Sequence, residues 1–449
     1  MITKMKLICL FLVIVLISGC GPLVSQEGDI PTAEIPTVAT LPIFNPTAMQ
    51  IPSQTASPFP TQPPLPIKLF SIDRLRIIYE KDGNIYLQNG LNTAQKLTSS
   101  GVDRDPIVSD NGEIILFYRG KTNNKVYSIR ADGTEEKLLI DTMTLRKLSQ
   151  GEVKGITFIP GSTDFLFNTY LCNIPLPGAY DPVECVVGLY KMDFFSGKIH
   201  RVVTGLSGNR LHDRNFAISP NGQFLSVAAS GHVDVYVASG GRYEIIKRDA
   251  ITYLRTLPVE YLATQYWFPD SSGFVSVIAN SGYYGLLEYP STFAAYRYNL
   301  GDDRPVLIPL DPMMRSNPAL DLDWALSPDR NWIFYHGRSS NFLGNLSTGA
   351  TTAFPLYNRA DNIKWSPGSQ YFLFYEELYS VHGSQMPVPA SHIGYSAIWL
   401  DDTHYLYNNM EASSPQESNY AIGVVGGNDI PLPETFEFES TSKIVILDP

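Results

Sequence analysis

Closely spaced acidic residues are the feature of this sequence with the clearest chemical potential. Two facing carboxylates can serve as acid, base or nucleophile in glycoside hydrolysis, provided that their separation in space suits the mechanism. Most of the acidic pairs fall at expected hairpin turns or strand ends, where solvated acidic residues are common. We therefore favour a structural role for them and assign no catalytic residue. The pairs are Asp302 with Asp303, Asp321 with Asp323, Glu376 with Glu377, and Asp401 with Asp402.

The sequence motifs of other enzyme classes and of metal centres do not occur. The fragment nearest to a Gly-x-Ser-x-Gly nucleophile elbow, Gly394 to Ile398, has isoleucine where the second glycine must permit a tight turn. The histidines form neither a His-Glu-x-x-His motif nor a His/Cys cluster with zinc-like spacing. We therefore expect no metal ligand and no cofactor. The histidines are His200, His212, His232, His336, His382, His392 and His404.

Two cysteines, Cys172 and Cys185, lie in the part of the chain that is expected to fold. They are separated by a short, Pro-rich segment between two expected strands. In an oxidising compartment a disulfide between them is the natural interpretation, and two free thiols are the alternative.

The first 20 residues read MITKMKLICLFLVIVLISGC and have the three parts of a secretory signal. A basic start with Lys4 and Lys6 precedes an apolar run, and small residues precede Cys20. The apolar run is shorter than the roughly 20 residues that a membrane-spanning helix needs, so we expect cleavage.

The residues Leu16-Ile17-Ser18-Gly19-Cys20 resemble the bacterial lipobox. That resemblance implies that residues 1–19 are removed and that Cys20 carries the lipid that anchors the chain to a membrane. An ordinary signal peptide with a chance cysteine, or an uncleaved apolar anchor, is the alternative. All of these interpretations place the remaining residues outside the cytoplasm, in a bacterial cell envelope.

Residues 20–68 are rich in proline and threonine and have no periodic apolar pattern. Such a segment cannot bury enough surface to offset the entropy of ordering it, so we expect a disordered tether. About 45 residues of this kind could extend on the order of 100 Å.

Charge and composition limit the partners of the remaining chain. Lys plus Arg number 33 against 44 for Asp plus Glu, and removal of Lys4 and Lys6 leaves 31 against 44, a formal charge of −13. This excess of negative charge argues against nucleic acid as a ligand. Aromatic residues make up 12% and charged residues 17%, which is typical of an all-β protein.

One pattern recurs seven times between Asp105 and Met410: a short apolar strand, a turn similar to Ser-Pro-Asn-Gly, and a strongly apolar strand. A second hairpin follows most copies, so each repeat predicts a sheet of four strands, A to D. The pattern predicts a β-propeller. The turn positions are Asp110, Pro160, Pro220, Pro269, Pro328, Pro367 and Asp401.

The two ends of residues 69–449 complete this pattern. Residues 76–98 supply strands B, C and D of a further sheet without a strand A, and residues 443–447 form an apolar run without a sheet of its own. Pairing both ends in one blade would close the ring and remove its unpaired edges. We therefore favour eight blades, with seven as the alternative, and we expect a monomer.

The Ser-Pro-Asp/Asn-Gly turns and the aromatic and β-branched strands that follow them resemble the WD40-like (PD40) repeats of TolB-type propellers. The resemblance covers about residues 70–449. It implies a closed ring with a central channel that mediates contacts with proteins or other ligands. The chain has more repeats than TolB and a tether in place of its N-terminal domain, which puts a role in the Tol system in doubt.

Long connections are expected at the end of the blades opposite the Ser-Pro turns, because B–C and D–A connections share that end. We assign them to residues 171–186, 242–259, 281–291 and 411–418. Their tyrosines suit recognition, because each offers a large ring with a polar tip. The alternative is that these loops only decorate the scaffold. The residues expected to form this binding face are Tyr180, Tyr243, Tyr253, Tyr283, Tyr284 and Tyr289.

Two functions remain open from the sequence. The first is a surface lipoprotein that binds a protein, peptidoglycan or another glycan. The second is an extracellular hydrolase or lyase with an acidic site at the channel mouth, for which Asp321, Asp323 and Glu377 are the residues to place. The absence of catalytic motifs favours the first.

Overall fold

The computed structural model divides the chain into two units, Met1–Pro58 and Phe59–Pro449, and all described residues lie in the second. The predicted signal peptide, the lipid attachment at Cys20 and the tether therefore lie outside the described residues. None of the described helices is long and apolar enough to cross a membrane. The structure describes residues 71–148, 151–172, 185–207, 216–229, 232–252, 264–284, 289–310, 314–315, 324–336, 340–354, 363–374, 377–381, 385–386, 397–409, 419–432 and 443–446.

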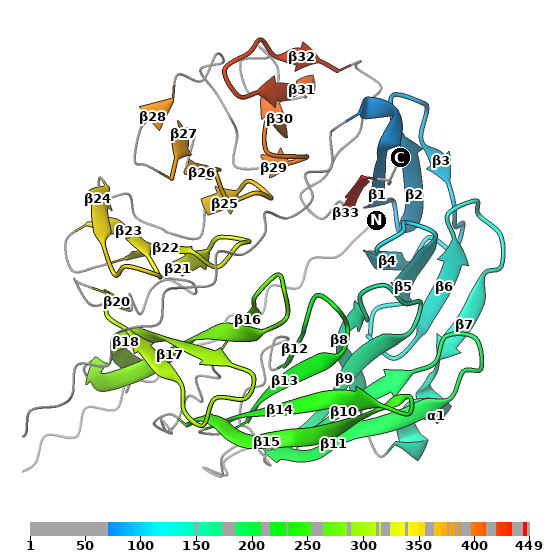
Figure 1. Cartoon of the computed structure of the whole chain (residues 1–449). Helices are drawn as coiled ribbons and strands as arrows, with labels where there is room; N and C mark the ends of the chain where they lie inside the picture. The colour runs from blue at the N-terminus through cyan, green and yellow to red at the C-terminus, as the bar shows by residue number, and fades with distance from the viewer. Residues whose placement is uncertain are drawn as a thin grey trace, which may run out of the picture. The chain divides into compact units, whose positions relative to one another are not determined.

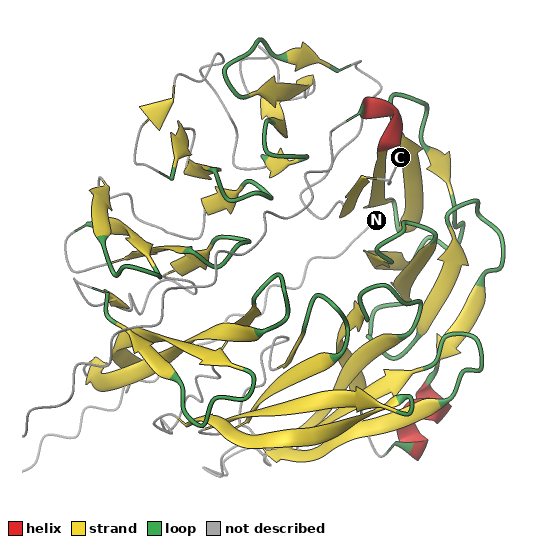
Figure 2. Cartoon of the chain, viewed as in Figure 1, coloured by secondary structure: helices red, strands yellow, loops and turns green. Residues whose placement is uncertain are grey.

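The second unit consists of eight antiparallel sheets of four paired strands each, with one extra short strand in the fifth. Figure 1 shows the sheets following one another around a common axis in chain order. Figure 2 shows that strands dominate the described part, with η1 (Ile72–Arg74) and α1 (Thr142–Lys147) as its helices. The predicted all-β propeller with eight blades is confirmed.

The strands of each blade pair in the order A to D. Blades 1 to 4 comprise β33 (Lys443–Ile446), β1 (Leu75–Lys81), β2 (Asn84–Asn89) and β3 (Gln95–Lys96); β4 (Asp103–Val108), β5 (Ile114–Arg119), β6 (Val126–Arg130) and β7 (Lys137–Ile140); β8 (Glu152–Phe158), β9 (Phe165–Cys172), β10 (Cys185–Met192) and β11 (Ile199–Ser207); and β12 (Phe216–Ile218), β13 (Phe224–Ala229), β14 (His232–Ser239) and β15 (Arg242–Thr252).

Blades 5 to 8 follow the same order. They comprise β16 (Thr264–Trp267), β17 (Gly273–Tyr284), β18 (Tyr289–Asn299) and β19 (Val306–Ile308), with β20 (Met314–Arg315) also paired to β18; β21 (Trp324–Leu326), β22 (Trp332–His336), β23 (Asn341–Asn345) and β24 (Thr351–Phe354); β25 (Ile363–Trp365), β26 (Tyr371–Phe374), β27 (Glu377–Ser380) and β28 (Gln385–Met386); and β29 (Ile398–Trp399), β30 (His404–Asn409), β31 (Asn419–Val424) and β32 (Ile430–Pro431).

The C-terminal strand closes the ring. β33 pairs antiparallel with β1, with Val445 opposite Arg76 and Ile444 opposite Ile77, and it takes the strand A position of blade 1. Figure 1 shows the dark red β33 beside the blue β1. This arrangement confirms the predicted pairing of the two chain ends, which leaves the inner edge of blade 1 covered.

The core consists of apolar clusters that are each shared by two neighbouring blades. Successive residues of a strand point to opposite faces of its sheet, so a strand between two blades is apolar on both faces. In β1, Ile77 packs with Leu406 of blade 8, whereas Ile78 packs with Ile115 of blade 2. The cluster between blades 8 and 1 shows that the ring is closed by packing as well as by strand pairing.

The Ser-Pro motif has a specific structural role in the A–B turn. In blade 4 the backbone N–H of Phe224 donates to Ser219 Oγ at 2.8 Å, and the N–H of Gln223 donates to Asn221 Oδ1 at 3.0 Å. Ser327 and Asp329 accept the equivalent bonds in blade 6. The serine and the Asn/Asp therefore satisfy the N–H groups that begin strand B, which explains why these residue types recur.

Candidate functional site

The two ends of the blades have different characters. The A–B and C–D turns form one end, which we call the turn-bearing face. The connections 173–184, 253–263, 285–288 and 410–418 leave the blades at the other end, which we call the loop-bearing face, and these connections lie outside the described residues.

Neighbouring A–B turns on the turn-bearing face are hydrogen-bonded to one another. The N–H of Asn221 in blade 4 donates to Ser271 Oγ in blade 5 at 3.1 Å. The N–H of Asp329 in blade 6 donates to Ser369 Oγ in blade 7 at 2.9 Å, and the N–H of Gly161 in blade 3 donates to Asp110 in blade 2. These bonds join the A–B turns of neighbouring blades and help to hold the ring together.

Three of the tyrosines predicted for the binding face lie at the tip of one hairpin. β17 and β18 are 12 and 11 residues long, and their last pairs before the connection join Tyr284 to Tyr289 and Tyr283 to Pro290. The predicted B–C insertion is thus mostly an extended hairpin at the loop-bearing face. Tyr180 and Tyr253 lie outside the described residues.

Tyr243 lies elsewhere, and the predicted D–A connection at 242–259 needs correction. β15 begins at Arg242, so Tyr243 belongs to strand D beside the turn-bearing face, and the connection comprises residues 253–263. The Tyr243 ring packs between blades 3 and 4, and its hydroxyl donates to Gly222 O at 2.9 Å. This burial, and secondarily the charge of Asp164, raises the pKa of Tyr243 to about 12. The ring is a core element and does not offer a contact surface.

Cys172 and Cys185 lie directly opposite each other at the end of the β9–β10 hairpin, as Cα partners in its register. Opposite residues of an antiparallel pair have Cα atoms about 4.5 to 5.5 Å apart, which falls within the range that a disulfide spans. The register therefore suits the predicted disulfide, which stays a prediction.

The acidic pairs of the sequence do not form one catalytic group among the described residues. Asp401 accepts hydrogen bonds from the backbone N–H groups of Thr403 and His404, and Asp402 accepts one from the N–H of Gly368. Glu377 accepts a hydrogen bond from the Tyr379 hydroxyl. Glu376, Asp321 and Asp323 lie outside the described residues, so the hydrolase alternative stays a hypothesis.

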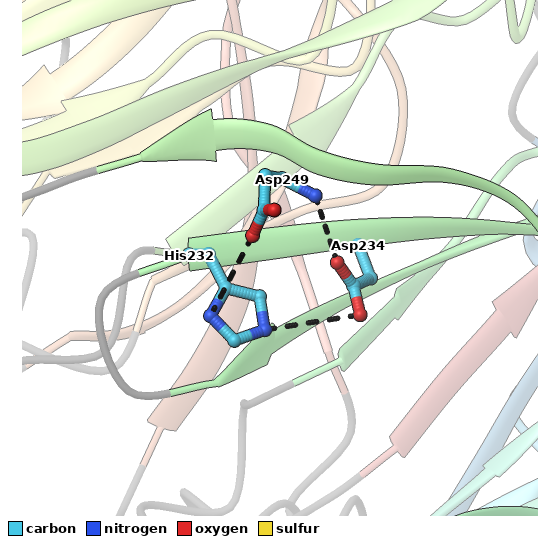
Figure 3. Close-up of side chains that lie close together, drawn as sticks. All are labelled: His232, Asp234 and Asp249. Atoms are coloured by element: carbon cyan, nitrogen blue, oxygen red, sulfur yellow. Dashed lines mark hydrogen bonds and ion pairs between the residues drawn. The ribbon is translucent and has the colours of Figure 1, made fainter.

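A cluster that the sequence motifs did not predict lies at the loop-bearing end of blade 4. His232 and Asp234 are two residues apart on β14 and Asp249 is on the neighbouring strand β15, and Figure 3 shows the three side chains facing one another. His232 Nε2 is 3.8 Å from Asp234 Oδ2, and His232 Nδ1 is 4.0 Å from Asp249 Oδ1. The cluster therefore combines one imidazole with two carboxylates.

A bulge in strand D positions this cluster. Between the pairs Val233–Ile251 and Val235–Lys247, three residues of β15 oppose Asp234 alone, and the middle one is Asp249 with φ +51°. The extra residues let the N–H of Asp249 donate to Asp234 Oδ1 at 2.9 Å. Bulges commonly redirect a side chain in this way. The His-x-Asp spacing of His232 and Asp234 on one strand could be recognised in the sequence. The bulge that brings Asp249 to them could not.

A cavity of about 450 Å³ opens between blades 2 and 3 near the turn-bearing face. Phe195, whose side chain is 79% exposed, forms part of its rim. Two of its charged residues, Arg130 and Glu113, lie 4.0 Å apart and partly neutralise each other. These groups have structural partners, so we do not assign chemistry to this cavity.

Comparisons with known proteins add no functional assignment. Neither a family model nor a curated protein sequence matches the chain. Among solved structures, the chain is similar to TolB from Acinetobacter baumannii, at 14% identity and a TM-score of 0.33, with 79% of this chain and 78% of that chain covered.

Two peptidase structures are also similar to the chain. A puromycin-hydrolyzing peptidase of Mycobacterium tuberculosis shows 12% identity and a TM-score of 0.42, with 83% of this chain and 56% of that chain covered. Dipeptidyl peptidase 4 of Porphyromonas gingivalis shows 12% identity and a TM-score of 0.38, with 66% of this chain and 46% of that chain covered. The chain spans about half the length of these peptidases. Because all three TM-scores are low, the assignment of an eight-bladed propeller rests on the sheet topology of the chain itself.

Proposed function

We propose that the chain is a binding module of a bacterial cell envelope, anchored to a membrane by a lipid on Cys20. It binds a protein or glycan ligand through the loop-bearing face. The observation that carries this proposal is the difference between the two faces. The A–B turns of the turn-bearing face form bonds between blades, whereas the loop-bearing face carries the extended β17–β18 hairpin.

The chemistry of the hairpin tip suits recognition. Its register brings Tyr284 and Tyr289 together as a pair and places Tyr283 next to them. Tyrosine provides a large contact area at a low entropic cost and a hydroxyl for one hydrogen bond, which makes it frequent in recognition surfaces. Binding modules of this kind place such residues on a rigid scaffold, and the closed ring of blades supplies one.

The anchor can be tested in the bacterial cell. The wild-type chain should incorporate a labelled fatty acid and sediment with membranes, whereas Cys20→Ser should do neither, because it lacks the thiol that receives the lipid. Cys9→Ser is the matched control, since Cys9 lies in the segment that is removed. Labelling of Cys20→Ser would contradict the lipid anchor at this residue.

The binding face can be tested on ligands captured from the native envelope and then purified. The double variant Tyr283→Ala/Tyr284→Ala should weaken the affinity of such a ligand at least tenfold without lowering the melting temperature appreciably. Phe195→Ala, on the opposite face, is the control and should bind like the wild type. Equal affinity of the double variant and the wild type would count against this face. Hydrolysis of the captured ligand by the wild-type chain but not by Glu377→Gln would favour the hydrolase.

A further inference from the structure

We propose that His232, Asp234 and Asp249 form a binding site for one divalent transition-metal ion, with Zn²⁺ as the ion that fits best. The three side chains supply one imidazole nitrogen and two carboxylate oxygens. Zn²⁺ accepts both types of ligand, whereas Ca²⁺ and Mg²⁺ prefer ligand sets made of oxygen alone. The ligand chemistry therefore selects the class of ion.

The geometry of the cluster needs only a small adjustment to hold this ion. One ligand atom from each residue lies within 4.8 Å of the ligand atoms of the other two. Ligands about 2.1 Å from a tetrahedral Zn²⁺ are roughly 3.4 Å from one another. The difference is at most about 1.4 Å, and side-chain rotation can supply it because all three side chains are partly exposed. The exposed fractions are 34% for His232, 15% for Asp234 and 62% for Asp249.

The charges around the cluster also favour a cation. Among the described residues, neither carboxylate has a lysine or arginine within ion-pair distance, and both face the single imidazole of His232. Lys247, two residues before Asp249, lies instead near Asp303 at 3.8 Å. Two carboxylates held this close repel each other, and a divalent ion between them would remove that repulsion.

The hydrogen bonds of the cluster orient its ligands. The N–H of Asp249 donates to Asp234 Oδ1, which leaves Asp234 Oδ2 directed toward the imidazole. Outer hydrogen bonds that fix a ligating carboxylate in this way are typical of metal sites. Since the amide belongs to a residue that is itself a ligand, the bulge in β15 sets the positions of both carboxylates.

Three protein ligands leave one position of a four-coordinate ion open. Asp249 lies near the end of β15 and His232 begins β14, so the site lies at the loop-bearing end of blade 4. A water molecule or a ligand oxygen would complete the coordination. The metal site does not depend on the proposed ligand-binding function, because the ion alone is sufficient to test it.

The test is calorimetric titration of the metal-free full chain with ZnCl₂, after dialysis against a chelator. The wild type should bind one equivalent of Zn²⁺ at this site. His232→Ala, Asp234→Asn and Asp249→Asn should each weaken that binding at least tenfold. His200→Ala on the neighbouring blade and Asp303→Asn are matched controls that remove an imidazole or a carboxylate outside the cluster, and they should bind like the wild type.

A second measurement guards against variants that misfold. Zn²⁺ should raise the melting temperature of the wild type and the two controls but not that of Asp234→Asn, which keeps the size of the side chain. The absence of saturable Zn²⁺ binding would overturn the proposal, as would unchanged affinity in His232→Ala. Tighter binding of Ca²⁺ than of Zn²⁺ would overturn the assignment to a transition metal.

Discussion

Asp103 and Arg119 form a two-point ion pair across strands β4 and β5 of blade 2. Arg119 Nε donates to Asp103 Oδ1 at 2.5 Å and Nη2 donates to Oδ2 at 3.0 Å, and the Asp103 side chain is completely buried. The guanidinium also lies 4.2 Å from the centre of the Tyr127 ring. The hydrogen bond to Asp103 is the main cause that raises the pKa of Arg119. The pair therefore joins a fully buried carboxylate to a partly buried guanidinium.

Asp103→Ala should reduce the free energy of unfolding by about 3 kcal/mol, because it leaves a partly buried guanidinium without its main partner. Glu136 contacts the same guanidinium at 2.7 Å from a more exposed position. Glu136→Ala should therefore cost less than about 1 kcal/mol. Urea denaturation of the two variants measures the contrast, and equal losses would show that the buried position of Asp103 is not decisive.

Gly222→Ala should destabilise the chain by about 2 kcal/mol, and Gly240→Ala by about 1 kcal/mol. Both glycines have a positive φ, +70° and +55°, so alanine is strained at either position. A Cβ at Gly222 would also lie 3.0 Å from Pro160 O in the neighbouring blade, whereas one at Gly240 meets no atom within 4 Å. Thermal denaturation of both variants checks the order, and a larger loss for Gly240→Ala would contradict the inter-blade contact.

Tyr243→Phe should change the dependence of stability on pH. The pKa of Tyr243 is raised from 10.0 to about 12, so the folded state holds the phenol proton more tightly than the unfolded state. The resulting stability is fully present below pH 10 and is lost as the pH rises toward 12. At pH 8 the variant should be about 1 kcal/mol less stable, because it lacks the hydrogen bond to Gly222 O.

The advantage of the wild type over Tyr243→Phe should therefore shrink between pH 10 and 12, since phenylalanine has no proton to lose. Urea denaturation of both chains at pH 8 and pH 11 measures the difference directly. A gap that stays constant with pH would argue against burial of the phenol.

When the chain is produced in an oxidising compartment, it should contain a disulfide between Cys172 and Cys185, whose register makes them opposite partners. Mass spectrometry of unreduced proteolytic fragments should recover the two segments as one linked species. Reduction should lower the free energy of unfolding by about 3 kcal/mol, because a closed loop of this size restricts the unfolded chain. Cys172→Ser/Cys185→Ser is the control that reduction should not affect. Alkylation of both thiols in the unreduced native chain would refute the bond.

The propeller could be predicted from the sequence because its determinants are local and repeat. The serine of the A–B turn accepts a hydrogen bond from the first residue of strand B, as Ser219 does from Phe224, and the same bond recurs at Ser109, Ser327 and Ser366. Residues with a positive φ were harder to recognise where glycine is replaced. Arg330 has φ +61° in its turn, and its guanidinium donates to Ser327 O in the same turn and to Trp267 O in the neighbouring blade. Only the folded ring brings Trp267 near.

The sequence by itself determined the strand order within the blades and the position of the A–B turns, because alternation of apolar residues and turn chemistry act over short separations. It also predicted the closure of the ring by β33, because the first sheet lacked a strand A and the last apolar run lacked a sheet of its own. The tertiary structure decided that Tyr243 is buried and that Asp249 joins His232. Both outcomes depend on where strand β15 begins and bulges against β14, which follows from packing between blades and has no local signature. The bulge in β15 brings the Asp249 carboxylate to the cluster without changing the alternation of apolar residues in the sequence.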